Sequence, residues 1–328
     1  MTSSSGKLSL SVVVCTYSPA RTAQVVALMD ALAAQTSRPH EVIVIVDHNP
    51  DLLVTLRERL PPATVIANAY ERGLSGGRNT GLEHATGDVV VFIDDDATPE
   101  PDWLERLGDG YEDPSVVGVG GRVEPAWEGD VPRWFPAEFG WVVGCGYAGL
   151  PDRPAAVRNF IGCNMSFRRL DVAGTGGFRI DLGRVGLAPV GCEETEFCIR
   201  LMHDAQGRRL WFDPSARVHH FVPRDRTTWA YFRARCYAEG RSKARVARLA
   251  GASSALSSER SYVAGTLTRA VARNLGRSLR GDRGAALRAG AIVIGLATTV
   301  AGYAVGRWQL AVGRERLGVA RQEPVHQS

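Results

Sequence analysis

The chain has 328 residues, of which 45% are hydrophobic and 23% charged, so it has the composition of a globular protein with a sizeable core and not of a disordered chain. The net charge of +4 is unevenly distributed. Residues 241–328 hold 15 Lys+Arg and 4 Asp+Glu, a balance of +11, whereas residues 1–240 have a balance of −7. A basic tail on an acidic body indicates an anionic partner for the tail, either a membrane or nucleic acid.

The six cysteines show no CxxC pair and no zinc-finger spacing, so we interpret them as reduced thiols that mostly pack in the core. The N-terminal apolar run is short and no small-residue cleavage site follows it. It therefore predicts a first strand and not a signal peptide.

Apolar, β-branched runs alternate with helical periodicity through the first part of the chain. This order predicts βαβ units around a mostly parallel sheet that is covered on both faces, which is an α/β fold. Strands are expected at 8–16, 41–46, 64–67, 89–93, 116–123 and 159–169, and helices at 22–35, 52–60, 82–85 and 102–107.

A glycine-rich stretch, RGLSGGRNTG, covers residues 72–81. We expect a loop here, in which glycines let the backbone approach a ligand and Arg78 adds a fork of donors for phosphate. The stretch matches neither GxGxxG nor a P-loop, and a plain flexible turn is the alternative.

Three adjacent aspartates, Asp94, Asp95 and Asp96, end the apolar strand at 89–93. Alternation along the strand directs Asp94 and Asp96 to one side and Asp95 to the other. Two carboxylates at the carboxyl end of a buried strand suit Mg²⁺ or Mn²⁺ carrying a substrate phosphate. The alternative is a solvated acidic turn, followed by a helix that begins at Thr98-Pro99.

Two further groups of polar residues follow an aromatic-rich segment at 124–154, whose rings could contact a sugar or lipid or simply cover the core. Glu193 and Glu194 stand at the start of an expected helix. They either stabilise its N-terminus or supply a general base. His219 and His220 end a late strand, where a histidine either completes a metal site or packs in the core.

The C-terminal part divides into a basic helical segment at 241–288, an uncharged apolar segment of 18 residues at 289–306, and a polar tail at 307–328. The apolar segment is near the lower length limit for a membrane-spanning helix and is rich in Gly and Ala. We expect it to span the membrane or lie in its surface; a core helix or a homodimer contact is the alternative. The larger basic cluster precedes it, which predicts that the catalytic part faces the cytoplasm, at the plasma membrane.

The order of the DDD, the Gly-Arg-Asn stretch and the Glu pair resembles the family 2 glycosyltransferases over residues 8–243. The resemblance implies a GT-A domain at 1–240, a nucleotide-sugar donor, Mg²⁺ or Mn²⁺, and inversion at the anomeric carbon. No QxxRW signature of the processive members is present, so transfer of a single sugar is implied. The pattern is similar to transferases that act on polyprenyl- or dolichyl-linked glycans, as in cell-envelope polysaccharide synthesis.

The resemblance also implies roles for individual residues. The nucleotide sugar would be bound by Thr16, Tyr17, Asp47, Arg78, Asn79, Asp94 and Asp95, and the metal by Asp96 and Asp94. His219 and His220 are added as candidate metal ligands because they end a strand. The second residue of the family's Glu-Asp pair is the catalytic base, and Glu194 stands there in place of Asp. Glu194 is therefore the implied base, with Glu193 as the alternative.

Other functions remain open from the sequence. The run VVVFIDDDAT also fits the motif of haloacid-dehalogenase-like phosphatases, with Asp94 as nucleophile, although neither Lys7 nor Lys243 is placed to assist. A non-catalytic nucleotide-sugar sensor is a further alternative. Nucleic-acid binding through the basic tail lacks an aromatic RNA motif or a zinc finger, and the acidic body argues against it.

Overall fold

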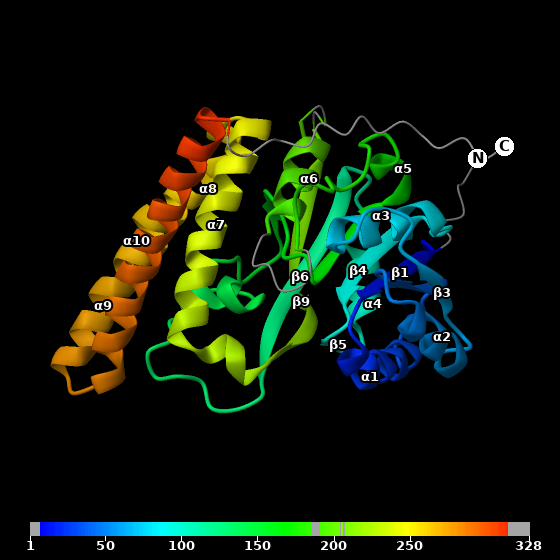
Figure 1. The fold of residues 1–328 in the computed structure, drawn as a ribbon, viewed down its shortest axis with the longest axis horizontal. Coiled ribbons are helices and arrows are strands. Elements are labelled where there is room, and N and C mark those ends of the chain that lie inside the picture. The colour runs from blue at the N-terminus through cyan, green and yellow to red at the C-terminus, as the bar shows by residue number, and fades with distance from the viewer. Residues whose placement is uncertain (1–6, 185–190, 204, 206, 314–328) are drawn as a thin grey trace.

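The computed structural model describes residues 7–184, 191–203, 205 and 207–313 (Figure 1). Its strands are β1 (Leu10–Thr16), β2 (Glu41–Val46), β3 (Thr64–Ala67), β4 (Val89–Asp94), β5 (Ala97–Pro99), β6 (Val116–Trp127), β7 (Ala155–Val157), β8 (Asn164–Arg168) and β9 (Arg209–Val222). Its α-helices are α1 (Thr22–Ala33), α2 (Pro50–Arg59), α3 (Leu74–His84), α4 (Trp103–Asp109), α5 (Arg169–Val172), α6 (Glu193–Leu201), α7 (Trp229–Ala250), α8 (Ala252–Ser261), α9 (Thr268–Leu279) and α10 (Arg283–Ala311). Short 3₁₀ turns are η1 (Pro19–Arg21), η2 (Ala137–Val143) and η3 (Arg224–Thr227), and η4 (Tyr262–Leu267) is a π-helical stretch.

The described strands form one sheet in the order β3-β2-β1-β4-β8-β6-β9-β5, with β7 paired to β9. The predicted α/β fold is confirmed. The sheet is parallel from β3 to β4, but β8 runs antiparallel to both β4 and β6, so the sheet as a whole is mixed. The carboxyl ends of β1, β2 and β4 therefore meet at one edge, which is where parallel sheets bind ligands.

The glycine-rich stretch was predicted wrongly as a loop, because helix α3 occupies most of it. Its glycines allow this helix to pack closely on the sheet. A Cβ at Gly81 would lie 2.3 Å from Val13 Cγ1, and one at Gly77 would lie 3.1 Å from Cys15 Sγ. The glycines therefore bring the helix against β1 and do not form an open loop.

The alternative of an acidic turn followed by a helix at Thr98-Pro99 is excluded, since both residues belong to β5. Strand β5 pairs antiparallel with β9, placing Ala97 opposite His220. This pairing folds the chain after the aspartates back onto β9. It therefore brings a distant histidine to the end of β4.

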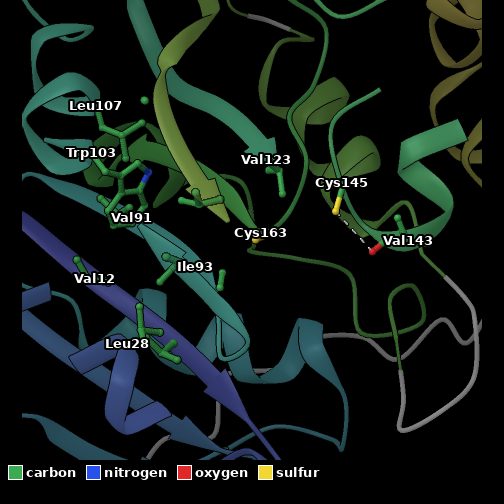
Figure 2. Packing of buried hydrophobic residues seen from close by; sticks show 14 of the residues in the cluster. Val12, Leu28, Val91, Ile93, Trp103, Leu107, Val123, Val143, Cys145 and Cys163 are labelled. Atoms are coloured by element: carbon green, nitrogen blue, oxygen red, sulfur yellow. Dashed lines mark hydrogen bonds between the residues drawn. The ribbon is translucent and has the colours of Figure 1, made fainter. Parts of the chain in front are cut away.

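Strand β4 is buried on both faces. Val91 and Ile93 pack in the same core cluster as Trp103 and Leu107 of α4 (Figure 2). Phe92, which points to the opposite face, contacts the rings of Phe167 and Phe178. Burial on both faces fixes the direction in which the chain emerges at Asp94.

The C-terminal helices pack against the sheet domain through aromatic side chains, with α10 at the outer edge of the molecule (Figure 1). Trp134, Phe135 and Phe139, from the aromatic-rich segment, contact Phe232 of α7. These rings therefore pack in the core and join α7 to the sheet domain. The expected domain limit at residue 240 falls inside α7, and the apolar segment 289–306 falls inside α10.

Candidate active site

A pocket lies where β1, β2 and β4 end. Seven of its lining residues are among those proposed from the sequence: Thr16, Tyr17, Asp47, Asp94, Asp95, Asp96 and His220. Three arginines that the sequence analysis did not select, Arg21, Arg184 and Arg226, also line it. The pocket is therefore rich in both carboxylate and guanidinium groups.

Asp94, Asp96 and His220 form a cluster that could hold a metal ion. Each offers one ligand atom, and these atoms lie within 4.8 Å of one another. Two carboxylate oxygens and an imidazole nitrogen are donors that suit Mn²⁺ and related divalent ions. The sequence-based prediction that Asp94 and Asp96 lie together is confirmed.

His219 is not part of this cluster. Successive side chains on β9 point to opposite sides, and His219 contacts Glu100 at 2.6 Å on the exposed side. Of the two histidines proposed as metal ligands, only His220 faces the aspartates.

The buried aspartates are neutralised by two cationic side chains. Arg21 Nη1 lies 2.5 Å from both Asp95 Oδ1 and Asp96 Oδ2, and His220 Nε2 lies 3.3 Å from Asp96 Oδ1. Burial opposes a charged imidazole, but the Asp96 carboxylate outweighs it and raises the pKa of His220 to about 10. Burial raises the pKa of Asp95 to about 6, although Arg21 opposes the shift.

Asp47 connects the end of β2 to the start of α3. Its Oδ1 accepts a hydrogen bond from Asn68 Nδ2 at 2.7 Å, and its Oδ2 accepts one from the Gly73 N–H at 3.0 Å. Nearby, Thr16 is buried and Tyr17 is 39% exposed, and both residues line the pocket. Thr16 and Tyr17 are therefore available to a ligand.

Arg78 and Asn79 lie deeper than expected, and neither lines this pocket. Arg78 is 2% exposed; it donates to Glu193 Oε1 at 2.7 Å and to the Gly162 carbonyl at 3.2 Å. Asn79 donates to the Phe178 carbonyl and accepts from the Phe178 N–H, so both ends of its amide group are hydrogen-bonded within the protein. Both side chains hold α3 in place.

The two glutamates at the start of α6 have different environments. Glu193 is 4% exposed and paired with Arg78, while its Oε2 has no partner among the described residues. Glu194 is partly exposed. Burial of its carboxyl, together with the neighbouring Glu193 charge, raises the pKa of Glu194 to about 8. Glu194 is thus the more accessible of the two and is poised to exchange a proton near neutral pH.

Of the three arginines that the sequence analysis missed, Arg21 and Arg226 lie on short turns and Arg184 lies outside any helix or strand, so hydrophobic periodicity gives no signal for them. Arg21 ends the turn η1 after β1, and Arg226 lies in η3 after β9. Their positions just beyond strand ends could have pointed to them, since ligand-binding residues concentrate there.

Comparisons with known proteins agree with this geometry. Residues 11–173 match the model of glycosyl transferase family 2. A glucosyl-dolichyl phosphate glucuronosyltransferase of Haloferax volcanii is 38% identical over 240 residues, covering 72% of this chain and 76% of the relative. The succinoglycan biosynthesis protein ExoM of Rhizobium meliloti is 29% identical over 247 residues, covering 73% of this chain and 75% of the relative.

Among solved structures, the fold is similar to that of the mannosyltransferase PcManGT from Pyrobaculum calidifontis in complex with GDP-Man and Mn²⁺. The TM-score is 0.56 at 21% identity, and the match covers 90% of this chain and 88% of that one. Family membership favours the transferase over the phosphatase alternative with Asp94 as nucleophile. This chain belongs to glycosyl transferase family 2 and is a glycosyltransferase.

Proposed function

We propose that the protein is a metal-dependent, inverting transferase that moves one sugar from a nucleotide-sugar donor to a hydroxyl of a glycan or lipid-linked acceptor. The observation that carries this proposal is the cluster of Asp94, Asp96 and His220, which opens on a pocket lined by Thr16, Tyr17 and Asp47. The first three side chains would hold the metal, and the last three would contact the nucleoside.

The donor set fits a divalent ion, because two carboxylates and an imidazole provide hard oxygen and borderline nitrogen ligands. When bound, Mn²⁺ or Mg²⁺ would neutralise charge on the departing nucleoside diphosphate. Asp95 would act indirectly, because its Oδ1 pairs with Arg21. Arg78 and Asn79 would position α3 without touching the donor.

Glu194 is the proposed general base. A base must reach the acceptor hydroxyl, and Glu194 is partly exposed whereas Glu193 is buried against Arg78. Its carboxylate would take the proton as the acceptor oxygen attacks the anomeric carbon from the face opposite the leaving group. One displacement inverts the configuration at that carbon.

The Haloferax volcanii relative suggests the substrate class. Its name describes a glucuronosyltransferase acting on glucosyl-dolichyl phosphate, and it is similar over most of both chains. We propose a uronic acid donor and a sugar carried on a polyprenyl phosphate as acceptor for this chain. A lipid-linked acceptor requires the active site to work at a membrane.

Helix α10 supports membrane contact. It is long and apolar enough to cross a bilayer, and a third of its most apolar window is buried inside the structure. Every exposed residue from 286 to 304 is uncharged and apolar: Ala286, Leu287, Gly290, Val293, Ile294, Ala297, Val300, Ala301 and Ala304. The outer face of α10 is thus an apolar strip, with exposed Arg283 and Arg307 at its two ends.

The inner face of α10 argues for a helix that lies in the membrane surface and does not span it. A Cβ at Gly302 would lie 2.1 Å from the Tyr237 carbonyl of α7, and one at Gly240 of α7 would lie 2.0 Å from the Thr299 carbonyl. Helix α7 carries seven charged residues, and spanning would take these charges into hydrocarbon at high cost. We therefore propose that the arginine-flanked strip binds the cytoplasmic face of the plasma membrane in plane.

A donor and acceptor panel tests the transferase proposal. The full chain would be assayed with UDP-glucuronate, UDP-glucose and GDP-mannose, with Mn²⁺, Mg²⁺ or EDTA, and with glucosyl polyprenyl phosphate as acceptor. We expect metal-dependent transfer from a uronate donor with inverted stereochemistry in the product. Nucleotide-sugar binding without turnover on any acceptor would instead indicate a sensor.

Vesicle flotation tests the membrane proposal. We expect the protein to bind anionic vesicles and to bind them less at high salt or after the Val293→Asp substitution. We also expect alkaline carbonate to extract the protein from the vesicles. Resistance to carbonate would show a spanning helix. A dimer that persists in dilute solution and is broken by Val293→Asp would assign the strip to a homodimer contact.

A further inference from the structure

Arg226 is a buried arginine that lines the donor pocket. It is 9% exposed and lies in the short turn η3, just after β9. Its backbone N–H bonds to the Pro223 carbonyl. Its guanidinium makes no hydrogen bond or ion pair with any residue in the part of the chain that the structure describes.

The other strongly buried arginines of this region are paired. Arg78 contacts Glu193 at 2.7 Å, and Arg21 contacts Asp95 and Asp96 at 2.5 Å. His220, Arg21 and, to a smaller degree, the charge of Arg226 lower the pKa of Asp96, but only Arg21 and His220 contact its carboxylate. A guanidinium that lines a pocket and makes no hydrogen bond there leaves its N–H donors to an anionic ligand.

The charge of the pocket leads to the same conclusion. Four aspartates and three arginines line it, so its formal charge is −1 when His220 is neutral, as a metal ligand must be. A divalent ion at Asp94, Asp96 and His220 would change that to +1. Arg226 would then face a donor that carries at least two negative charges on its diphosphate.

The fold explains why Arg226 lies there. Strand β9 pairs with β5 and so places His220 beside Asp96, and the chain then turns at Pro223 into η3. The end of β9 thus supplies His220 as a candidate metal ligand, and Arg226 follows it six residues later.

We propose that Arg226 binds an oxyanion of the nucleotide-sugar donor, either on its diphosphate or on a carboxylate of its sugar. This inference rests on the proposed function. It adds a specificity-determining residue to the donor site.

The test compares Arg226→Gln with Arg224→Gln, which removes an exposed arginine from the same turn. Calorimetric titration of each full-length protein with Mn²⁺ would use UDP, UDP-glucose and UDP-glucuronate as probes. We expect Arg226→Gln to weaken binding about 10- to 100-fold, the effect of losing a hydrogen bond to a charged group. Arg224→Gln should stay within about twofold of wild type, as expected for an exposed charge.

The three probes distinguish the two sources of the oxyanion. If Arg226 binds the diphosphate, Arg226→Gln weakens all three ligands alike. If it binds the sugar carboxylate, only UDP-glucuronate loses affinity, and selectivity over UDP-glucose disappears. Wild-type affinity of Arg226→Gln for all three probes, or an equal loss in Arg224→Gln, would overturn the inference.

Arg226→Lys provides a second variant if Arg226→Gln does not fold. Lysine keeps the charge but not the bidentate fork, so we expect a smaller loss, about 3- to 10-fold. An Arg226→Lys protein with wild-type affinity for every probe would also overturn the inference. If the wild-type protein bound no nucleotide sugar, the proposed function itself would fail.

Discussion

Arg78 and Glu193 form a buried ion pair, with Nη1 of the arginine 2.7 Å from Oε1 of the glutamate. Both residues are less than 5% exposed, and Arg78 Nη2 also lies 3.9 Å from Asp94 Oδ1. Arg78 therefore connects the start of α6, which carries the proposed base, to the end of β4, which carries the proposed metal ligands.

This relationship predicts a large loss of stability on Arg78→Met. The substitution would leave Glu193 buried without a counter-charge, which costs about 3–5 kcal/mol in comparable pairs. Urea denaturation monitored by circular dichroism would measure it. Because the two residues interact directly, Arg78→Met combined with Glu193→Gln should be less destabilised than the sum of the single variants. Additive effects would show that the pair is not coupled.

The Glu194 carboxylate should control turnover without affecting donor affinity. We expect Glu194→Gln to lower kcat by about 10²- to 10⁴-fold, the usual contribution of general acid–base catalysis. Its Kd for the donor, measured by calorimetry, should remain unchanged. Glu193→Gln is the matched comparison, because it should mainly affect stability through Arg78. Normal turnover by Glu194→Gln would assign the base elsewhere.

The same residue predicts the pH dependence of the reaction. The folded protein raises the pKa of Glu194 from its ordinary value of 4.5 to about 8, mainly through burial and then through the Glu193 charge. Only the unprotonated carboxylate can accept a proton, so kcat/KM should rise as the pH increases through about 8 and then level off. A profile that is flat between pH 6 and 9 would contradict this assignment.

The two adjacent histidines offer a matched test of the metal site. We expect His220→Gln to abolish Mn²⁺-dependent donor binding, because His220 lies in the cluster with Asp94 and Asp96. His219→Gln should bind metal and donor normally, because His219 faces Glu100 on the exposed side of β9. Mn²⁺ binding followed by electron paramagnetic resonance would measure both. Equal effects of the two substitutions would exclude His220 as a specific ligand.

The close contact between α3 and β1 predicts opposite outcomes at two glycines. Gly81→Ala should destabilise the protein by about 1–3 kcal/mol, the typical cost of overpacking, because its Cβ would lie 2.3 Å from Val13 Cγ1. Gly108→Ala, in α4, meets no atom within 4 Å. It should stabilise by about 0.4–1 kcal/mol through reduced entropy of the unfolded chain. Thermal unfolding would compare them, and equal shifts in Tm would contradict this account.

The sequence by itself determined the features that depend on local pattern. The periodicity of the apolar runs defined β2 and β3 to the residue, and the run before the three aspartates correctly placed Asp94 and Asp96 at the end of a buried strand. The uneven charge and the uncharged segment at 289–306 also follow directly from the order of residues.

Tertiary structure decided what depends on contacts between distant segments. Pairing of β5 with β9 selected His220 over His219, since adjacent residues of a strand look alike in sequence but point to opposite faces. The fit of α3 against β1 made the glycines a packing feature, and burial made Arg78 a partner of Glu193. Arg226 acquired its place beside the pocket because the chain turns back after β9, and no local pattern of residues encodes that proximity.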